Sequence, residues 1–188
     1  MPEWPKELVK GFKRSFVIPA RSISPIEIRL MRDSLAVNLV WLLLLDAKVP
    51  HPESAVVRDG LPDDDYGEGN ADWETGALTD NVVATYINGA LANNKYAGFY
   101  GIAAQDANPV VDVVIFRVGA GGGVPRGRFQ IEPLYAEQEA VGYWPEPIVY
   151  HPTETVFIEV EPRDTKAAPG DNLVLMSLVG EAKGPFVG

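Results

Sequence analysis

Apolar and polar residues alternate at several places along the chain, a pattern typical of half-buried strands. In the segment IEIRLMR (26–32), Ile26, Ile28 and Leu30 alternate with Glu27 and other long side chains. We therefore predict a strand over 26–32, followed by a turn at residues 33–34.

The most apolar stretch of the chain runs over 35–46 and contains LVWLLLL (39–45). A run of this kind fits either a buried helix or a strand covered on both faces, and we predict a strand. Its seven apolar residues are too few for a membrane-spanning helix, which needs about 20, so we predict no transmembrane segment.

One helix is predicted over residues 80–93. Asp80 is a suitable N-cap, Val83, Ile87 and Leu91 recur at helical spacing, and two asparagines follow. This helix is expected to be inserted among strands.

Strand patterns dominate the rest of the chain, with Gly, Pro, Asn or Asp at each junction. They cover 97–103, 110–118, 128–135, 146–150, 155–161 and 172–180. With the two strands above, they predict an all-β fold, a single jelly roll or related β-sandwich with one inserted helix. We expect a basic N-terminal arm over 1–20 and one domain over 21–188, including a long acidic loop over 49–79 that we predict to be irregular.

Two of the predicted strands, 110–118 and 172–180, are apolar on both faces. A simple sandwich exposes one face of each sheet to water and therefore needs alternation. Either the inserted helix and the long loop cover the second faces, or a partner chain contributes.

The charge is uneven along the chain. Its net value is -10 over 188 residues, which argues against a general nucleic-acid binder. Residues 1–32 carry seven basic and three acidic side chains, a net charge of +4, which leaves -14 for the rest. The basic arm either packs on the protein surface or contacts a membrane surface or nucleic acid.

The beginning of the chain lacks a signal-peptide pattern, so we expect no export, unless a leader was removed.

The segment VGAGGGVPRGRF (118–129) invites comparison with phosphate-binding loops. Gly119 and Gly121 fit a dinucleotide-binding pattern, but Val124 takes the third glycine position and Pro125 disfavours the helix that must follow. We therefore predict a connection between two strands, carrying Arg126 and Arg128 toward an acidic neighbour.

The sequence shows no catalytic or metal-binding signature. There is no cysteine, and His51 and His151 lack the paired spacing of a zinc site. No G-x-S-x-G motif is present, so we predict no enzyme, no cofactor and no small-molecule substrate.

The loop DDDYGEGNADWE (63–74) has Glu68 where a calcium loop requires glycine. A solvated loop is predicted there, with an irregular calcium site as the alternative.

Three aromatic residues, Trp73, Tyr143 and Trp144, are candidates for a sugar-binding or partner surface, although packing in the core or in turns is the default interpretation. A soluble ligand-binding β-sandwich module, with carbohydrate as one ligand, is therefore the alternative function.

The segment PEPIVYHPTETVFIEVEPRDTKAAPGDNLVLMSLVGEAKG (145–184) resembles the C-terminal part of bacteriophage and related viral coat or decoration proteins. The resemblance lies in a proline-bounded strand, a T-x-x-I-x-V strand, a polar turn and a final apolar strand ending in glycine. It implies a virion structural protein, a capsid subunit or a capsid-decorating (cement) protein, assembled in the host cytoplasm. Its partners would be copies of itself or a major capsid protein, and its basic arm would face genome or membrane. The residues predicted to make these interactions are Lys6, Lys10, Lys13, Arg14, Trp73, Arg126, Arg128 and Trp144.

Overall fold

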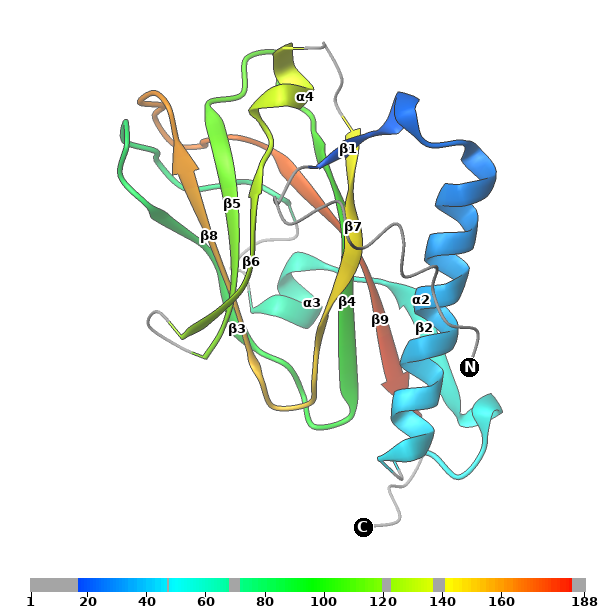
Figure 1. Ribbon diagram of the computed structural model, residues 1–188. Coiled ribbons are helices and arrows are strands. Elements are labelled where there is room, and N and C mark those ends of the chain that lie inside the picture. Colours follow the sequence, from blue (N-terminus) through cyan, green and yellow to red (C-terminus); the bar gives the residue numbers. More distant parts are fainter. Residues whose placement is uncertain (1–16, 47, 68–71, 120–122, 137–140, 184–188) are drawn as a thin grey trace.

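The chain forms a β-sandwich with one long helix on its outside (Figure 1). The structure, a computed structural model, describes residues 17–46, 48–67, 72–119, 123–136 and 141–183. It confirms the predicted all-β sandwich with one main helix. The predicted position of that helix is wrong.

Two antiparallel sheets make up the sandwich. The five-stranded sheet has the order β1-β7-β4-β9-β2, and the four-stranded sheet has the order β3-β8-β5-β6. The first contains β1 (Ile18–Pro19), β7 (Val141–Tyr150), β4 (Lys95–Ala104), β9 (Leu173–Ala182) and β2 (Ala55–Asp59). The second contains β3 (Ala84–Ala90), β8 (Thr155–Pro162), β5 (Val111–Val118) and β6 (Val124–Gln130). The helical elements are η1 (Ala20–Ser22), α2 (Pro25–Leu45), η2 (Pro52–Ser54), α3 (Pro62–Tyr66) and α4 (Glu132–Ala136).

Aromatic side chains fill the space between the sheets. The ring of Trp144 stacks on Phe129 at 4.3 Å and meets the edge of Phe116 at 5.6 Å. Phe99 contacts Phe116 at 5.4 Å and Tyr150 at 5.8 Å. These rings belong to β4, β5, β6 and β7. Because side chains alternate along a strand, each of these four strands sends every second residue into this core.

The predicted strands over 26–32 and 35–46 are wrong, because both segments belong to the helix α2. Its start is fixed by a capping box, in which the Glu27 N–H donates to Ser24 Oγ at 3.2 Å and the Ser24 N–H donates to Glu27 Oε2 at 2.8 Å. Leu35, Leu39 and Leu43, four residues apart, are buried against the five-stranded sheet. The helical period of these leucines, rather than the alternation over 26–32, decides the structure.

Two glycines let α2 lie close to the sheet. A Cβ atom on Gly98 of β4 would stand 2.6 Å from Leu35 Cδ1, and one on Gly180 of β9 would stand 2.9 Å from Leu39 Cβ. Both distances are too short for a side chain. These positions therefore make room for the leucine row of the helix.

The predicted helix over 80–93 is also wrong, because residues 84–90 form β3. This strand pairs with β8 from Ala84 opposite Val160 to Ala90 opposite Thr155, with one irregularity between Thr85 and Ile87. Ile87 is buried in the core between the sheets. Pairing with a neighbouring strand thus outweighs the helical spacing of three apolar residues.

Two further predictions need correction. The acidic segment 49–79 is not irregular throughout, since it contains η2, β2 and α3, and β2 pairs with β9. The predicted strand over 128–135 ends at Gln130 and is followed by α4.

Candidate interaction surface

The α2 helix is apolar on two opposite sides. One side packs on the sheet through its leucine row, and the other presents five large apolar side chains that are more than half exposed. They are Ile26, Leu30, Val37, Trp41 and Leu45, and we call them the α2 outer face. Helices that are apolar all round are usually buried in larger structures, so this face is unusual for a surface helix.

An apolar groove lies beside this face. It has a volume of about 340 Å³ and is formed where α2 lies next to η2 and β2. Its walls are Ala36, Val37, Val40, Trp41, Leu44, Pro52 and Val57, and we call it the α2 groove. Since Val37 and Trp41 belong to both features, the groove and the α2 outer face form one continuous apolar surface.

Charged groups lie near the N-terminal half of α2. Arg29 pairs with Asp33 at 3.6 Å, and Arg32 donates a hydrogen bond to Asp59 of β2 at 3.0 Å. This hydrogen bond raises the pKa of Arg32. By contrast, residues 34–45 contain no charged side chain.

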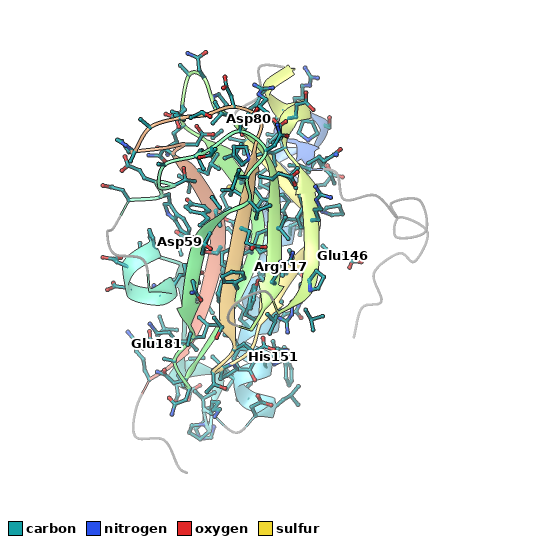
Figure 2. All side chains as sticks on the ribbon, turned by 90° about the vertical axis from the view of Figure 1, so that its left-hand side faces the viewer. Asp59, Asp80, Arg117, Glu146, His151 and Glu181 are labelled. Atoms are coloured by element: carbon teal, nitrogen blue, oxygen red, sulfur yellow. The ribbon has the colours of Figure 1, made fainter. Side chains whose placement is uncertain are left out.

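The outer face of the four-stranded sheet is covered in a different way (Figure 2). Arg117 of β5 donates to Glu159 of β8 at 2.6 Å, and Arg128 of β6 donates to Glu161 at 2.6 Å. These residues surround Ile115, whose direct partners across the strands are Arg128 and Glu159. Ile115 is buried although it points away from the core, because the aliphatic stems of its charged neighbours cover it.

The two arginines that follow the glycine-rich segment meet acids of their own chain. Arg126 pairs with Glu154 at 2.7 Å and lies over the ring of Tyr150 at 5.0 Å, and Arg128 pairs with Glu161 as described above. β5 and β6 are adjacent antiparallel strands, with Val118 opposite Val124. The prediction that this segment joins two strands is confirmed, but Arg126 and Arg128 lie within β6 and not on the connection as predicted.

The described part of the acidic segment 63–74 uses one carboxylate internally. Asp65 is fully buried and accepts hydrogen bonds from Arg58 at 2.6 and 2.7 Å and from Lys95 at 2.8 Å. Burial opposes ionisation, but the hydrogen bonds from Arg58, Lys95 and the Leu61 N–H together lower the pKa of Asp65. Among the residues that the structure describes, no three His, Asp or Glu side chains come together as metal ligands would.

The aromatic candidates pack inward. Trp144 is fully buried in the core, so its predicted role on an interaction surface is wrong. Trp73 packs against the core, with its ring 6.0 Å from Tyr66, and Tyr143 stacks on Tyr100 at 6.5 Å. These three rings therefore do not form a flat platform for a sugar.

The remaining candidates are separate from these surfaces. His151 meets the ring of Tyr96 edge-on at 5.3 Å, and His51 is exposed just before η2. The predicted basic interaction residues Lys6, Lys10, Lys13 and Arg14 lie outside the described residues.

The sequence reasoning missed the α2 outer face because it assigned α2 to strands. One signal was present in the run 39–45: Leu39 and Leu43 are one turn apart, and so are Trp41 and Leu45, on the other side of a helix. Read at helical spacing, the run gives two apolar rows instead of one.

Comparisons with protein-family models, with curated proteins and with solved structures found no match to this chain. Within the described ranges, no helix is both long and apolar enough to cross a lipid bilayer.

Proposed function

We propose that this protein is a structural subunit of a protein shell, either a capsid subunit or a capsid-decorating protein. It would act by binding copies of itself or neighbouring shell subunits. The α2 outer face is the observation that carries the proposal, because its five exposed apolar side chains and the adjoining groove form a continuous apolar surface. Such surfaces on soluble proteins usually mark interaction sites.

Two further observations support an assembly role. The α2 helix packs on an antiparallel sheet through its buried leucine row, so its outer face points away from the sandwich. The segment 145–184, which resembles viral coat and decoration proteins, forms most of β7 and all of β8 and β9, three central strands of the sandwich. The resemblance and the exposed apolar face point to the same kind of function by separate arguments.

The proposal is tested by assembly measurements on the full chain. Size-exclusion chromatography with light scattering, over a series of protein concentrations, should show self-association. If it does not, the protein should co-sediment with shell particles prepared from its native source and be visible on them by electron microscopy. A chain that stays monomeric and binds no such particle would contradict the proposal.

A second candidate function is binding of a small apolar ligand in the α2 groove. Its volume of about 340 Å³ is in the range of small-molecule sites, and all its wall residues are apolar. An apolar wall suits an aliphatic or aromatic ligand better than a carbohydrate. A saturable change in tryptophan fluorescence on adding a hydrophobic dye, lost in Trp41→Ala, would favour this candidate.

A further inference from the structure

We propose that the α2 outer face binds the same face of a second copy of this chain, with the two α2 helices antiparallel about a two-fold axis. This inference rests on the proposed function, since it names the partner and the geometry of one assembly contact. The partner is inferred from the spacing, the charge distribution and the size of the apolar surface.

On the side of α2 that faces away from the sheet, exposed Leu30, Val37 and Trp41 and half-buried Ser34 and Leu44 have the spacing of a helix-packing seam. Leu30, Ser34, Val37, Trp41 and Leu44 follow one another at intervals of four, three, four and three residues. This heptad spacing keeps a row of side chains facing a second helix along its length. A seam of this kind favours a helix as the partner.

A defined register lets large side chains meet small ones. If the two-fold axis passes at the level of Leu39, Val37 lies opposite Trp41 of the copy and Ser34 lies opposite Leu44 of the copy. Each layer then combines one larger and one smaller residue, as interdigitated packing requires. The α2 groove beside Trp41 provides the space for the indole ring of the other copy.

The charge distribution favours the antiparallel orientation. The charged residues of α2 are Glu27, Arg29, Arg32 and Asp33, all in its N-terminal half. With the axis at Leu39, the uncharged segments 34–44 of the two copies lie on each other, Leu45 lies at the level of Asp33 of the copy, and the charged turns lie toward opposite ends. A parallel pair would bring the two charged turns together and align the helix dipoles unfavourably.

The size of the surface fits a second copy better than a small ligand. With the axis at Leu39, the two helices overlap from residue 33 to residue 45, about 18 Å at 1.5 Å per residue. Val37, Trp41 and Leu45 of the α2 outer face lie within this overlap, and Ile26 and Leu30 lie beyond the end of the partner helix. A stable interface buries about 800 Å² on each partner, and the groove walls Pro52 and Val57 supply further area.

The first experiment compares two valines of similar exposure. Val37 on the α2 outer face is 55% exposed, and Val82, before β3, is 53% exposed. Sedimentation equilibrium of wild type should show a dimer or a dimer-based assembly. Val37→Lys should raise the dissociation constant of the pair at least about tenfold, while Val82→Lys should leave it within about twofold. Circular dichroism melting curves check that both variants are folded.

The second experiment measures the orientation of the helices. The chain has no cysteine, so single spin labels can be placed at Asn38→Cys and Arg29→Cys. In the antiparallel pair, the two Asn38 positions differ by about 3 Å along the helix axes and the two Arg29 positions by about 30 Å. Pulsed electron spin resonance should therefore give a much shorter distance for the Asn38 label than for the Arg29 label.

The outcomes separate this inference from the proposed function. Self-association that is unchanged in Val37→Lys overturns the α2 pairing but leaves assembly through another face. Equal label distances at the two positions overturn the antiparallel orientation. A wild-type chain that is monomeric at all concentrations overturns the pairing, and its binding to shell particles then decides the proposed function independently.

Discussion

The two sheets differ in what covers the apolar residues on their outer faces. In the four-stranded sheet, Val113 and Ile115 of β5 point outward and are covered by the Arg and Glu side chains of neighbouring strands. In the five-stranded sheet, outward residues such as Tyr96 and Leu178 are covered by α2. The outermost layer over the four-stranded sheet therefore consists of solvated charged side chains of the same chain. The outermost layer over the five-stranded sheet is apolar, because it is the α2 outer face.

This difference separates two kinds of stabilisation. Burial under α2 is non-directional and scales with apolar area, at about 25 cal/mol per Å². Exposed ion pairs contribute much less, typically up to about 1 kcal/mol each, because water and salt screen them. We therefore expect burial under α2 to contribute more to the free energy of unfolding than the ion pairs do. The ion pairs are expected chiefly to shield the apolar residues of the four-stranded sheet from water.

The largest effect is expected from Leu39→Ala. Leu39 is completely buried between α2 and the sheet, and truncation leaves a cavity there. The free energy of unfolding should fall by about 2–5 kcal/mol in urea denaturation. Leu45→Ala, an exposed position on the same helix, is the control and should change it by less than about 1 kcal/mol at low protein concentration. Similar losses in both variants would mean that α2 is not packed as described.

The buried ion pair at Asp65 should give the next largest effect. Asp65→Asn leaves Arg58 and Lys95 without their buried carboxylate and should destabilise the protein by on the order of 3 kcal/mol at neutral pH. Because the pKa of Asp65 is lowered in the folded state, its ionisation stabilises the protein above the unfolded pKa of about 4. That contribution is lost as the pH falls through the folded pKa.

The corresponding measurement is thermal melting between about pH 7 and pH 2. Wild type should lose stability steeply below about pH 4, and Asp65→Asn should show a shallower loss over the same interval. Parallel curves for the two proteins would show that another group controls the acid limb.

A smaller effect is expected for the partly buried pair Arg117–Glu159 on the four-stranded sheet. A double-mutant cycle of Arg117→Gln and Glu159→Gln should give a coupling energy of about 0.5–1 kcal/mol in low salt. Because the pair is only partly buried, the coupling should shrink in about 1 M NaCl. A coupling above about 2 kcal/mol that resists salt would contradict the view of this face as a solvated cover.

The smallest effect is expected for salt on the association of wild type. The seam between residues 34 and 45 is uncharged, so the dissociation constant of the dimer should change by no more than a few-fold between low and high NaCl. Sedimentation at both salt concentrations measures this. Loss of the dimer in high salt would instead favour association through the charged face.

The strands with the strongest apolar patterns were predictable from sequence. The predictions over 97–103, 110–118, 155–161 and 172–180 agree with β4, β5, β8 and β9, because these strands contribute to the core between the sheets. The expectation that something covers their second faces was also sound for β5 and β9. In the structure, ion-paired side chains cover the second face of β5. The second face of β9 is covered by α2, a segment predicted to form strands.

The candidate surface was not predictable in the same way. The sequence predicts Arg126 and Arg128 as interaction residues, and they pair with Glu154 and Glu161 of their own chain. Trp144 was selected as well, but it is a core residue. The exposure of Trp41 does not follow from the sequence pattern, because it depends on residues 25–45 forming a helix and on which side of that helix meets the sheet.

The amino-acid sequence is sufficient to predict the all-β character, the turns on either side of β8 and the strand connection at the glycine-rich segment. These features follow from local properties, namely the period of two, Gly and Pro conformations and the missing helix after Pro125. That 25–45 is a helix and 84–90 a strand depends on contacts between segments far apart in the sequence. Short apolar segments satisfy both periodicities locally, and the choice falls to packing partners distant in sequence: Gly98 and Gly180 beneath α2, and β8 beside β3.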